Sequence, residues 1–280
     1  MKTPDRCALT DLRNPHNPYL PQDKRTVFWY RRHRYWTPPP TAYPPICDIW
    51  NAAQRIDGTP AARYIAGRLG GTPEGELAAL RWLPADNDLR WSNGDKFAPP
   101  QSAAGWLAAA YYQLSLHGRY STEPHQIQLL PLNRHGHRLP HHQHRKAKTY
   151  GRASGTITAC PALLRPDAET DIVVVAESVI TALAGDILDG SRAALVISAG
   201  GASGADICHL LRKRNVRYHA DGDPAGRQVA ALIAAHAICY PDGTDAADSL
   251  KDRINRTRQQ RGQHGRTNTE YSATNTPSNR

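Results

Sequence analysis

The sequence predicts an α/β protein, in which a parallel sheet flanked by helices follows a smaller α+β domain and both ends are flexible and basic. From residue 171 onward, short apolar runs rich in β-branched residues alternate with longer segments of helical composition, joined by short connections. Such alternation is typical of a parallel sheet with right-handed crossovers. The two ends of the chain are polar, basic or proline-rich, and offer little apolar surface to bury.

These shifts in composition divide the chain into four parts. The predicted parts are a proline-rich, basic and aromatic arm (1–45), an α+β domain (46–165), an α/β domain (170–250) and a disordered basic tail (251–280). The arm cannot hold a packed core alone, because its prolines, including Pro38-Pro39-Pro40, interrupt any regular element. The tail follows Leu250, after which apolar residues become scarce.

The first domain has signals for two helices and a hairpin. A short helix is expected at 49–53. Thr59 is expected to cap a second helix, with Pro60 at its first position and Gly70-Gly71 beyond its end. Strands are expected within 106–116 and 126–132, and a hairpin turn at 133–136.

The second domain repeats a strand and a helix three times. Expected strands are 172–176, 194–198 and 216–220, and expected helices are 179–188, 204–214 and 224–237.

Acidic residues follow two of these strands. Glu177 follows the first strand, and Asp221-Gly222-Asp223 follows the third, directly before Pro224. Parallel strands place their carboxyl ends at one edge of a sheet, where α/β folds bind ligands. Carboxylate oxygens are the ligands that Mg²⁺ prefers. A structural interpretation is also open, in which Asp223 caps a helix and Glu177 favours a helix N-terminus.

Three segments carry a family resemblance. DIVVVAES (171–178), HADGDPAG (219–226) and YPDGTDAAD (240–248) resemble the Toprim domain of primases and topoisomerases. The resemblance implies a Toprim-like parallel sheet in which Glu177, Asp221 and Asp223 are catalytic. It also implies that these acids bind Mg²⁺ or Mn²⁺, with Asp245 as a further ligand. Ser178 stands where the family usually has glycine.

Three earlier segments look like the region that precedes Toprim in phage- and plasmid-type primases. They are IDGTPAARYIAGRLGG (56–71), QIQLLPLNRHGHRL (126–139) and KAKTYGRASGTITA (146–159). The resemblance implies a nucleotidyltransferase that synthesises primers on single-stranded DNA from nucleoside triphosphates. It places Lys146, Lys148 and Arg152 near the catalytic cleft, where they would contact phosphates; an ordinary exposed charged face is the alternative.

The charge of the chain favours a polyanionic partner. There are 35 Lys and Arg residues against 25 Asp and Glu, a net charge of +10. Cations and rings interleave in the arm, which fits single-strand binding through Trp29, Arg31, Arg32, Arg34 and Trp36. An edge strand packed on the adjoining domain is the alternative interpretation of this segment.

The cysteines and histidines predict no zinc. The five cysteines are dispersed without C-x-x-C spacing, so the zinc module that many primases carry is not expected. Histidines crowd 135–144, where a solvated loop is favoured over a metal site.

The remaining expectations concern location and partners. Without an apolar run of membrane length, we expect a cytoplasmic protein with no membrane partner. Helicase activity would need a separate polypeptide, since the chain has no phosphate-binding loop of the Walker A type. Two rival functions are open: a Toprim-type nuclease, and a non-catalytic accessory protein that binds single-stranded DNA.

Overall fold

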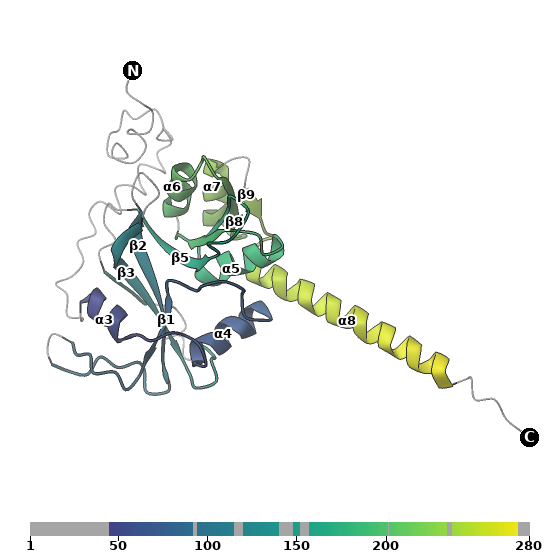
Figure 1. Cartoon of the computed structure of the whole chain (residues 1–280), viewed down its shortest axis with the longest axis horizontal. Coiled ribbons are helices and arrows are strands. Elements are labelled where there is room, and N and C mark those ends of the chain that lie inside the picture. The colour runs from purple at the N-terminus through teal and green to yellow at the C-terminus, as the bar shows by residue number, and fades with distance from the viewer. Residues whose placement is uncertain are drawn as a thin grey trace, which may run out of the picture.

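The chain folds around one mixed sheet with helices on both faces (Figure 1). The structure is a computed structural model, and it describes residues 45–91, 94–114, 120–139, 148–151, 157–200, 202–233 and 237–273. Within these residues the sheet has nine strands in the order β4-β3-β2-β5-β7-β6-β8-β9, and β1 pairs with β2. The strands are β1 (Leu80–Pro84), β2 (Gly105–Leu114), β3 (Tyr120–Leu132), β4 (Lys148–Gly151), β5 (Thr158–Leu164), β6 (Ile172–Ala176), β7 (Leu195–Ser198), β8 (Asn215–Ala220) and β9 (Ala237–Cys239). The predicted α/β class is confirmed.

The helices are α3 (Ile46–Ala52), α4 (Pro60–Leu69), α5 (Val179–Leu188), α6 (Ala202–Leu210), α7 (Pro224–Ile233) and α8 (Ala246–Ala273). Helices α5, α6 and α7 pack on the parallel strands, whereas α3 packs on β1 and β3. Every residue of β6 is buried, which explains its uninterrupted apolar run. Its alternate side chains divide the core: Val173 and Val175 pack with residues of α6 and α7, whereas Val174 and Ala176 pack with residues of α4, α5 and α8.

Strand β5 joins the antiparallel and parallel halves of the sheet. It pairs antiparallel with β2 at Thr158 and Ala159, and antiparallel with β7 from Cys160 onward. Strands β7, β6, β8 and β9 then run parallel. The sheet therefore continues across residues 165–170, where the sequence predicts a boundary between two domains.

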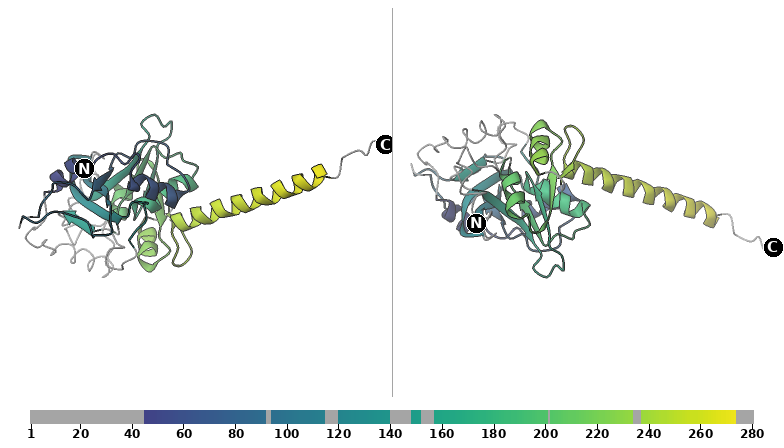
Figure 2. Two further views of the ribbon diagram at one scale, coloured as in Figure 1. Left: turned by 90° about the horizontal axis from the view of Figure 1, so that it is seen from below. Right: turned by 90° about the horizontal axis from the view of Figure 1, so that it is seen from above.

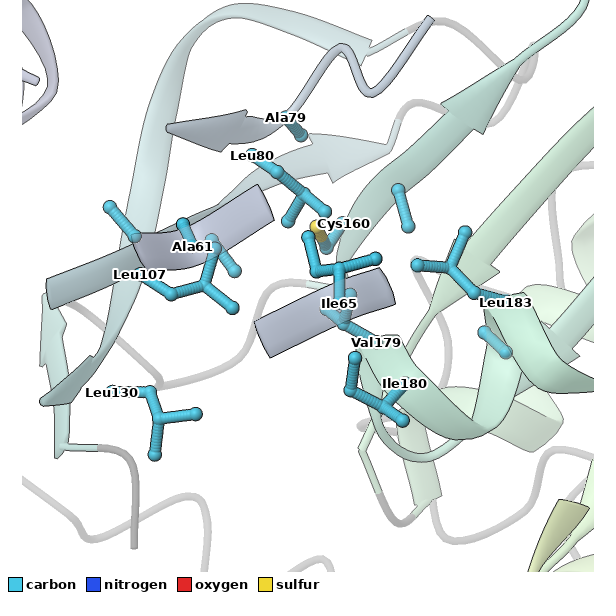
Figure 3. Close-up of a cluster of buried hydrophobic side chains, with 14 of the residues drawn as sticks. Ala61, Ile65, Ala79, Leu80, Leu107, Leu130, Cys160, Val179, Ile180 and Leu183 are labelled. Carbon is cyan, nitrogen blue, oxygen red and sulfur yellow. The ribbon is translucent and has the colours of Figure 1, made fainter. Parts of the chain in front are cut away.

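The larger core cluster crosses the same region. Ile65 of α4, Cys160 of β5, and Val179 and Ile180 of α5 belong to one group of buried side chains (Figure 3). Helix α4 thus packs against the first helix of the predicted α/β domain. This contact fixes the first half of the chain against the strands that carry the acids.

Helix α4 begins and ends where the sequence predicts, but without the expected side-chain cap, whereas α5 has one. Thr59 is the N-cap residue of α4 and Gly70 ends that helix in the left-handed conformation. The Thr59 hydroxyl nevertheless makes no capping bond, and donates to the Ile56 carbonyl instead. Ser178 caps α5, its hydroxyl accepting from the Thr181 N–H at 3.1 Å.

The helix predicted for 224–237 is shorter than expected. Helix α7 ends at Ile233, and Ala237–Cys239 forms β9, which pairs with β8. The alanine-rich sequence has a high helix propensity throughout, so its local composition contains no signal for the change. Pairing with the edge of β8 is a tertiary contact, which overrides that propensity.

The expectation of a disordered tail from Lys251 is also corrected, because α8 continues to Ala273. Asp245 caps this helix, and its first turns are anchored by the buried side chains of Ala246, Ala247 and Leu250. No proline interrupts residues 251–273, and arginine and glutamine favour a helix. Views from below and from above both show α8 projecting from the rest of the protein (Figure 2). Within the described ranges, no helix combines the length and apolarity needed to cross a membrane.

Candidate functional site

The acids predicted from sequence lie at one edge of the sheet. Glu177 directly follows β6, and Asp221 directly follows β8. These strands are parallel neighbours, with Ala176 opposite His219, so both carboxylates leave the sheet at the same edge. Burial raises the pKa of Asp221, and the negative charges of Glu177 and Asp223 add to this effect.

Asp221 is the most perturbed of these acids. Burial raises its pKa to about 7, with further contributions from Glu177, Asp245, Asp223 and Asp248, in that order. Its Oδ1 atom is buried and accepts no hydrogen bond from the described residues. Burial also raises the pKa of Glu177, and Asp223 adds to this effect. Carboxylates held together in this way favour a proton or a cation between them.

A loop from Pro241 to Thr244 crosses the glycine between Asp221 and Asp223. The Gly222 N–H donates to the Thr244 carbonyl, and the Gly243 N–H donates to the Gly222 carbonyl, both at 2.8 Å. A Cβ atom on Gly222 would lie 1.9 Å from the Pro241 oxygen, so only glycine allows this approach. One hollow is lined by Asp221, Gly222, Asp223, Gly243, Thr244, Asp245 and Asp248, and Glu177 is not among these residues.

Two of the acids also hold helix termini. Asp223 Oδ1 accepts from the Gly226 N–H at 2.7 Å, so Asp223 caps α7 as the structural interpretation predicted. Asp245 Oδ1 accepts from the Asp248 N–H at 2.9 Å, and its Oδ2 accepts from the Thr181 hydroxyl at 3.3 Å. Each cap uses one carboxylate oxygen. Glu177 is not the cap of the following helix, a position that Ser178 fills.

The donors suit a hard cation but do not converge on one point. Among the described residues, no three Asp, Glu, His or Cys side chains are grouped closely enough to hold a metal ion. Mg²⁺ commonly keeps several waters and takes only one or two carboxylates from the protein. The all-oxygen donor set and the orphaned Asp221 Oδ1 therefore fit a hydrated divalent ion.

A buried polar network lies behind the loop. His219 is 1% exposed, and its Nδ1 lies 2.6 Å from the Tyr240 hydroxyl while its Nε2 lies 3.2 Å from Asp189 Oδ2. Arg217 pairs with the same Asp189 oxygen at 3.3 Å. The network fixes Tyr240, the residue before the loop. The sequence analysis did not predict this network, although Arg217 and His219 are polar residues at alternate positions of β8 and were a visible signal.

Most predicted nucleic-acid contacts lie outside the described residues, namely Trp29, Arg31, Arg32, Arg34, Trp36, Lys146 and Arg152. Lys148 begins β4, the strand at the far end of the sheet order from β9. Four strands separate β4 from β6, which carries Glu177. The backbone of Lys148 is therefore not at the acid site. The predicted turn at 133–136 is present, closed by a bond from the Gly136 N–H to the Asn133 carbonyl.

The raised pKa of Asp221 predicts a pH-dependent stability. Its pKa rises from an ordinary 3.8 to about 7, so the folded protein holds this proton more tightly than the unfolded chain does. The free energy of unfolding is therefore expected to fall as pH rises from about 4 to 7. Asp221→Asn should be more stable than wild type by about 1–2 kcal/mol at pH 8, because solvent partly screens the effect. At pH 4 the gain should vanish. Urea unfolding in chelator at both pH values measures this difference, and an equal difference at both would contradict the assignment.

Comparison with known proteins gives distant likenesses. No protein-family model and no curated protein matches the chain. The primase fragment of the bacteriophage T7 primase-helicase protein is 12% identical, with a TM-score of 0.42, over 85% of this chain and 84% of that one. The DnaG catalytic core is 16% identical, with a TM-score of 0.35, over 72% of this chain and 68% of that one.

The RNA polymerase domain of Mycobacterium tuberculosis primase DnaG is 18% identical, with a TM-score of 0.33, over 56% of this chain and 57% of that one. These structural neighbours are DNA primase fragments. At TM-scores of 0.33–0.42 the likenesses carry no argument about activity, which has to be inferred from the residues of this chain.

Proposed function

We propose that the protein is a Toprim-type, primase-like nucleotidyltransferase that synthesises primers on single-stranded DNA in a phage or plasmid replication system. The observation that carries the proposal is that Glu177 and Asp221 follow neighbouring parallel strands at one sheet edge, where a buried oxygen of Asp221 has no hydrogen-bond partner among the described residues. Structural acids are normally paired, whereas acids that raise each other's pKa are typical of functional sites.

The chain's own residues would bind and orient the reacting groups. Glu177 and Asp221 are fixed by two neighbouring strands, and Asp223 and Asp245 by the helix termini that they cap. All four are candidate ligands of Mg²⁺ or Mn²⁺, which supply activation of a 3′-hydroxyl and neutralisation of the leaving pyrophosphate when bound. The hydroxyl of Thr181 orients the Asp245 carboxylate. Rigid supports of this kind reduce the reorganisation needed when substrate phosphates arrive.

Helix α8 is the candidate surface for nucleic acid. It begins at Ala246, directly after Asp245, which lines the hollow, and residues 251–273 contain six Lys or Arg against two acidic residues. Lys251, Arg253, Arg256 and Arg258 are exposed. A basic helix that starts at the acid site would contact the phosphates of a strand leaving that site.

Deleting residues 251–280 is therefore expected to weaken binding of single-stranded DNA. The fold should persist, because Ala246, Ala247 and Leu250 hold the start of the helix and remain in place. The logarithm of the affinity should depend less steeply on the logarithm of salt concentration, by about 0.7 for each phosphate that the shortened protein no longer neutralises. Fluorescence anisotropy over a salt series measures this slope. An unchanged slope would show that the segment does not touch nucleic acid.

One assay separates the proposed activity from its rivals. The purified protein is incubated with single-stranded DNA, labelled nucleoside triphosphates and Mg²⁺, and the products are sized. Labelled oligomers that disappear in excess chelator support the primase. Shortened template indicates a nuclease, and template binding without either product indicates an accessory protein. The last outcome is the one that the lack of a three-ligand group among the described residues would favour.

Two further expectations follow from the proposal. The protein should hold no stoichiometric zinc, and elemental analysis finding one tightly bound zinc per chain would contradict this. The replicative helicase would be a separate polypeptide, which co-purification with replication proteins can identify.

A further inference from the structure

Two buried polar atoms in the described part of the chain have no hydrogen-bond partner, and both belong to β8 or its end. They are the Tyr218 hydroxyl and Asp221 Oδ1. Leaving a buried hydroxyl unpaired is unfavourable, and native proteins rarely do so without a functional reason. A phenylalanine would fill the site of the Tyr218 ring equally well, so it is the hydroxyl that needs an explanation.

The Tyr218 side chain lies on the sheet face that leads to Glu177. In the parallel register Tyr218 is opposite Val175, and Glu177 is two residues farther along the same strand direction. Side chains two residues apart share a face, so Tyr218 and Glu177 are on the same side. A Cβ atom on Gly204 would lie 2.9 Å from Tyr218 Cε2 and 3.2 Å from its hydroxyl. Gly204 is in the first turn of α6, which begins beyond the carboxyl end of β7, at the edge where the acids lie.

The electrostatic surroundings agree with this position. Burial raises the pKa of Tyr218, and the charges of Glu177, Asp221 and Asp223 raise it further, together with Cys208. The hydroxyl therefore keeps its proton and can donate a hydrogen bond.

We propose that Tyr218 is a positioning residue of the acid site, whose hydroxyl donates a hydrogen bond to a water ligand of the divalent ion held by Glu177 and Asp221. Partners of this kind orient the groups around a metal and increase its affinity. The inference rests on the proposed metal-dependent function. In this role Tyr218 touches no substrate and helps to hold the ion.

The test compares Tyr218→Phe with wild type in full-length protein. Binding of Mn²⁺ is measured by electron paramagnetic resonance of the free ion, and melting temperature is measured in chelator. The dissociation constant for Mn²⁺ is expected to rise by about tenfold. The melting temperature in chelator should stay the same or rise, because an unpaired hydroxyl has been removed.

Tyr64→Phe is the matched control. Tyr64 is also buried, but its hydroxyl accepts a hydrogen bond from Arg138 Nε at 2.8 Å, in the first half of the chain. This variant should lower the melting temperature and leave Mn²⁺ binding unchanged.

The outcomes separate the inference from the proposed function. Unchanged Mn²⁺ affinity in Tyr218→Phe would overturn the role of the hydroxyl alone. A variant that melts lower in chelator, or fails to fold, would show that the hydroxyl already has a partner in the metal-free protein, which also overturns it. Wild-type protein that binds no Mn²⁺ would remove the proposed function, and the role of Tyr218 with it.

Discussion

Replacing Asp221 with alanine is expected to reduce Mg²⁺-dependent primer synthesis by about three orders of magnitude, equivalent to ~4 kcal/mol of transition-state stabilisation. Besides burial, the charges of Glu177, Asp245, Asp223 and Asp248 all raise the pKa of Asp221, so the variant removes the acid that interacts with each of the other four. Stability in the absence of metal should not fall, because removing one of several repelling carboxylates relieves strain. Incorporation of labelled nucleotide and urea unfolding measure the two effects.

Variants at two nearby aspartates sharpen this experiment. Asp223→Asn removes a charge but keeps an oxygen that can cap α7, so activity should fall while stability is retained. Asp242 is 90% exposed, pairs with Arg227 and does not line the hollow, so Asp242→Ala should remain active. If Asp221→Ala keeps full activity or unfolds at room temperature, the assignment of the acids is wrong.

Replacing Gly222 with alanine is expected to be among the most destabilising single changes in the protein. The new methyl group would lie 1.9 Å from the Pro241 oxygen and 2.9 Å from the Thr244 oxygen, both of them backbone atoms. The loop from Pro241 to Thr244 would have to move away and lose both hydrogen bonds to Gly222. We expect a loss of about 3 kcal/mol or more in the free energy of unfolding, together with loss of activity.

Gly243→Ala is the matched control in the same loop. Gly243 has a φ of 75°, but a Cβ atom there would have no neighbour within 4 Å. The variant should therefore lose only about 1 kcal/mol, from backbone strain. Chemical unfolding of both variants tests the difference, and equal losses would show that the crossing loop is not what requires glycine at 222.

The strands and helices around the acids could be predicted well because their signals are local. The run from Ile172 to Val175 is apolar on both faces, as a central parallel strand has to be, and Ser178 has a short polar side chain at a helix start. The strand at Ala237–Cys239 could not be predicted in the same way. Its pairing with β8 depends on an edge made by distant residues.

The acids themselves were also predictable, whereas their supports were not. Glu177 and Asp221 follow apolar strands, which is visible in the sequence. The requirement for glycine at position 222 was not visible in the sequence, because it comes from a loop some twenty residues farther on that passes directly over it. The partners of His219 come from Asp189 and Tyr240, on separate elements, and the unpaired hydroxyl of Tyr218 is a property of packing. Such contacts exist only once the chain has folded.

The length of α8 determines how far contacts with a bound strand could extend from the acids. At 1.5 Å per residue, a helix of 28 residues is about 42 Å long. One turn of duplex DNA is roughly 34–36 Å along its axis. Contacts of the proposed single-stranded DNA along the helix would thus extend over a length comparable to one duplex turn beyond the acids, so that the strand would be held over a distance and not at a single point.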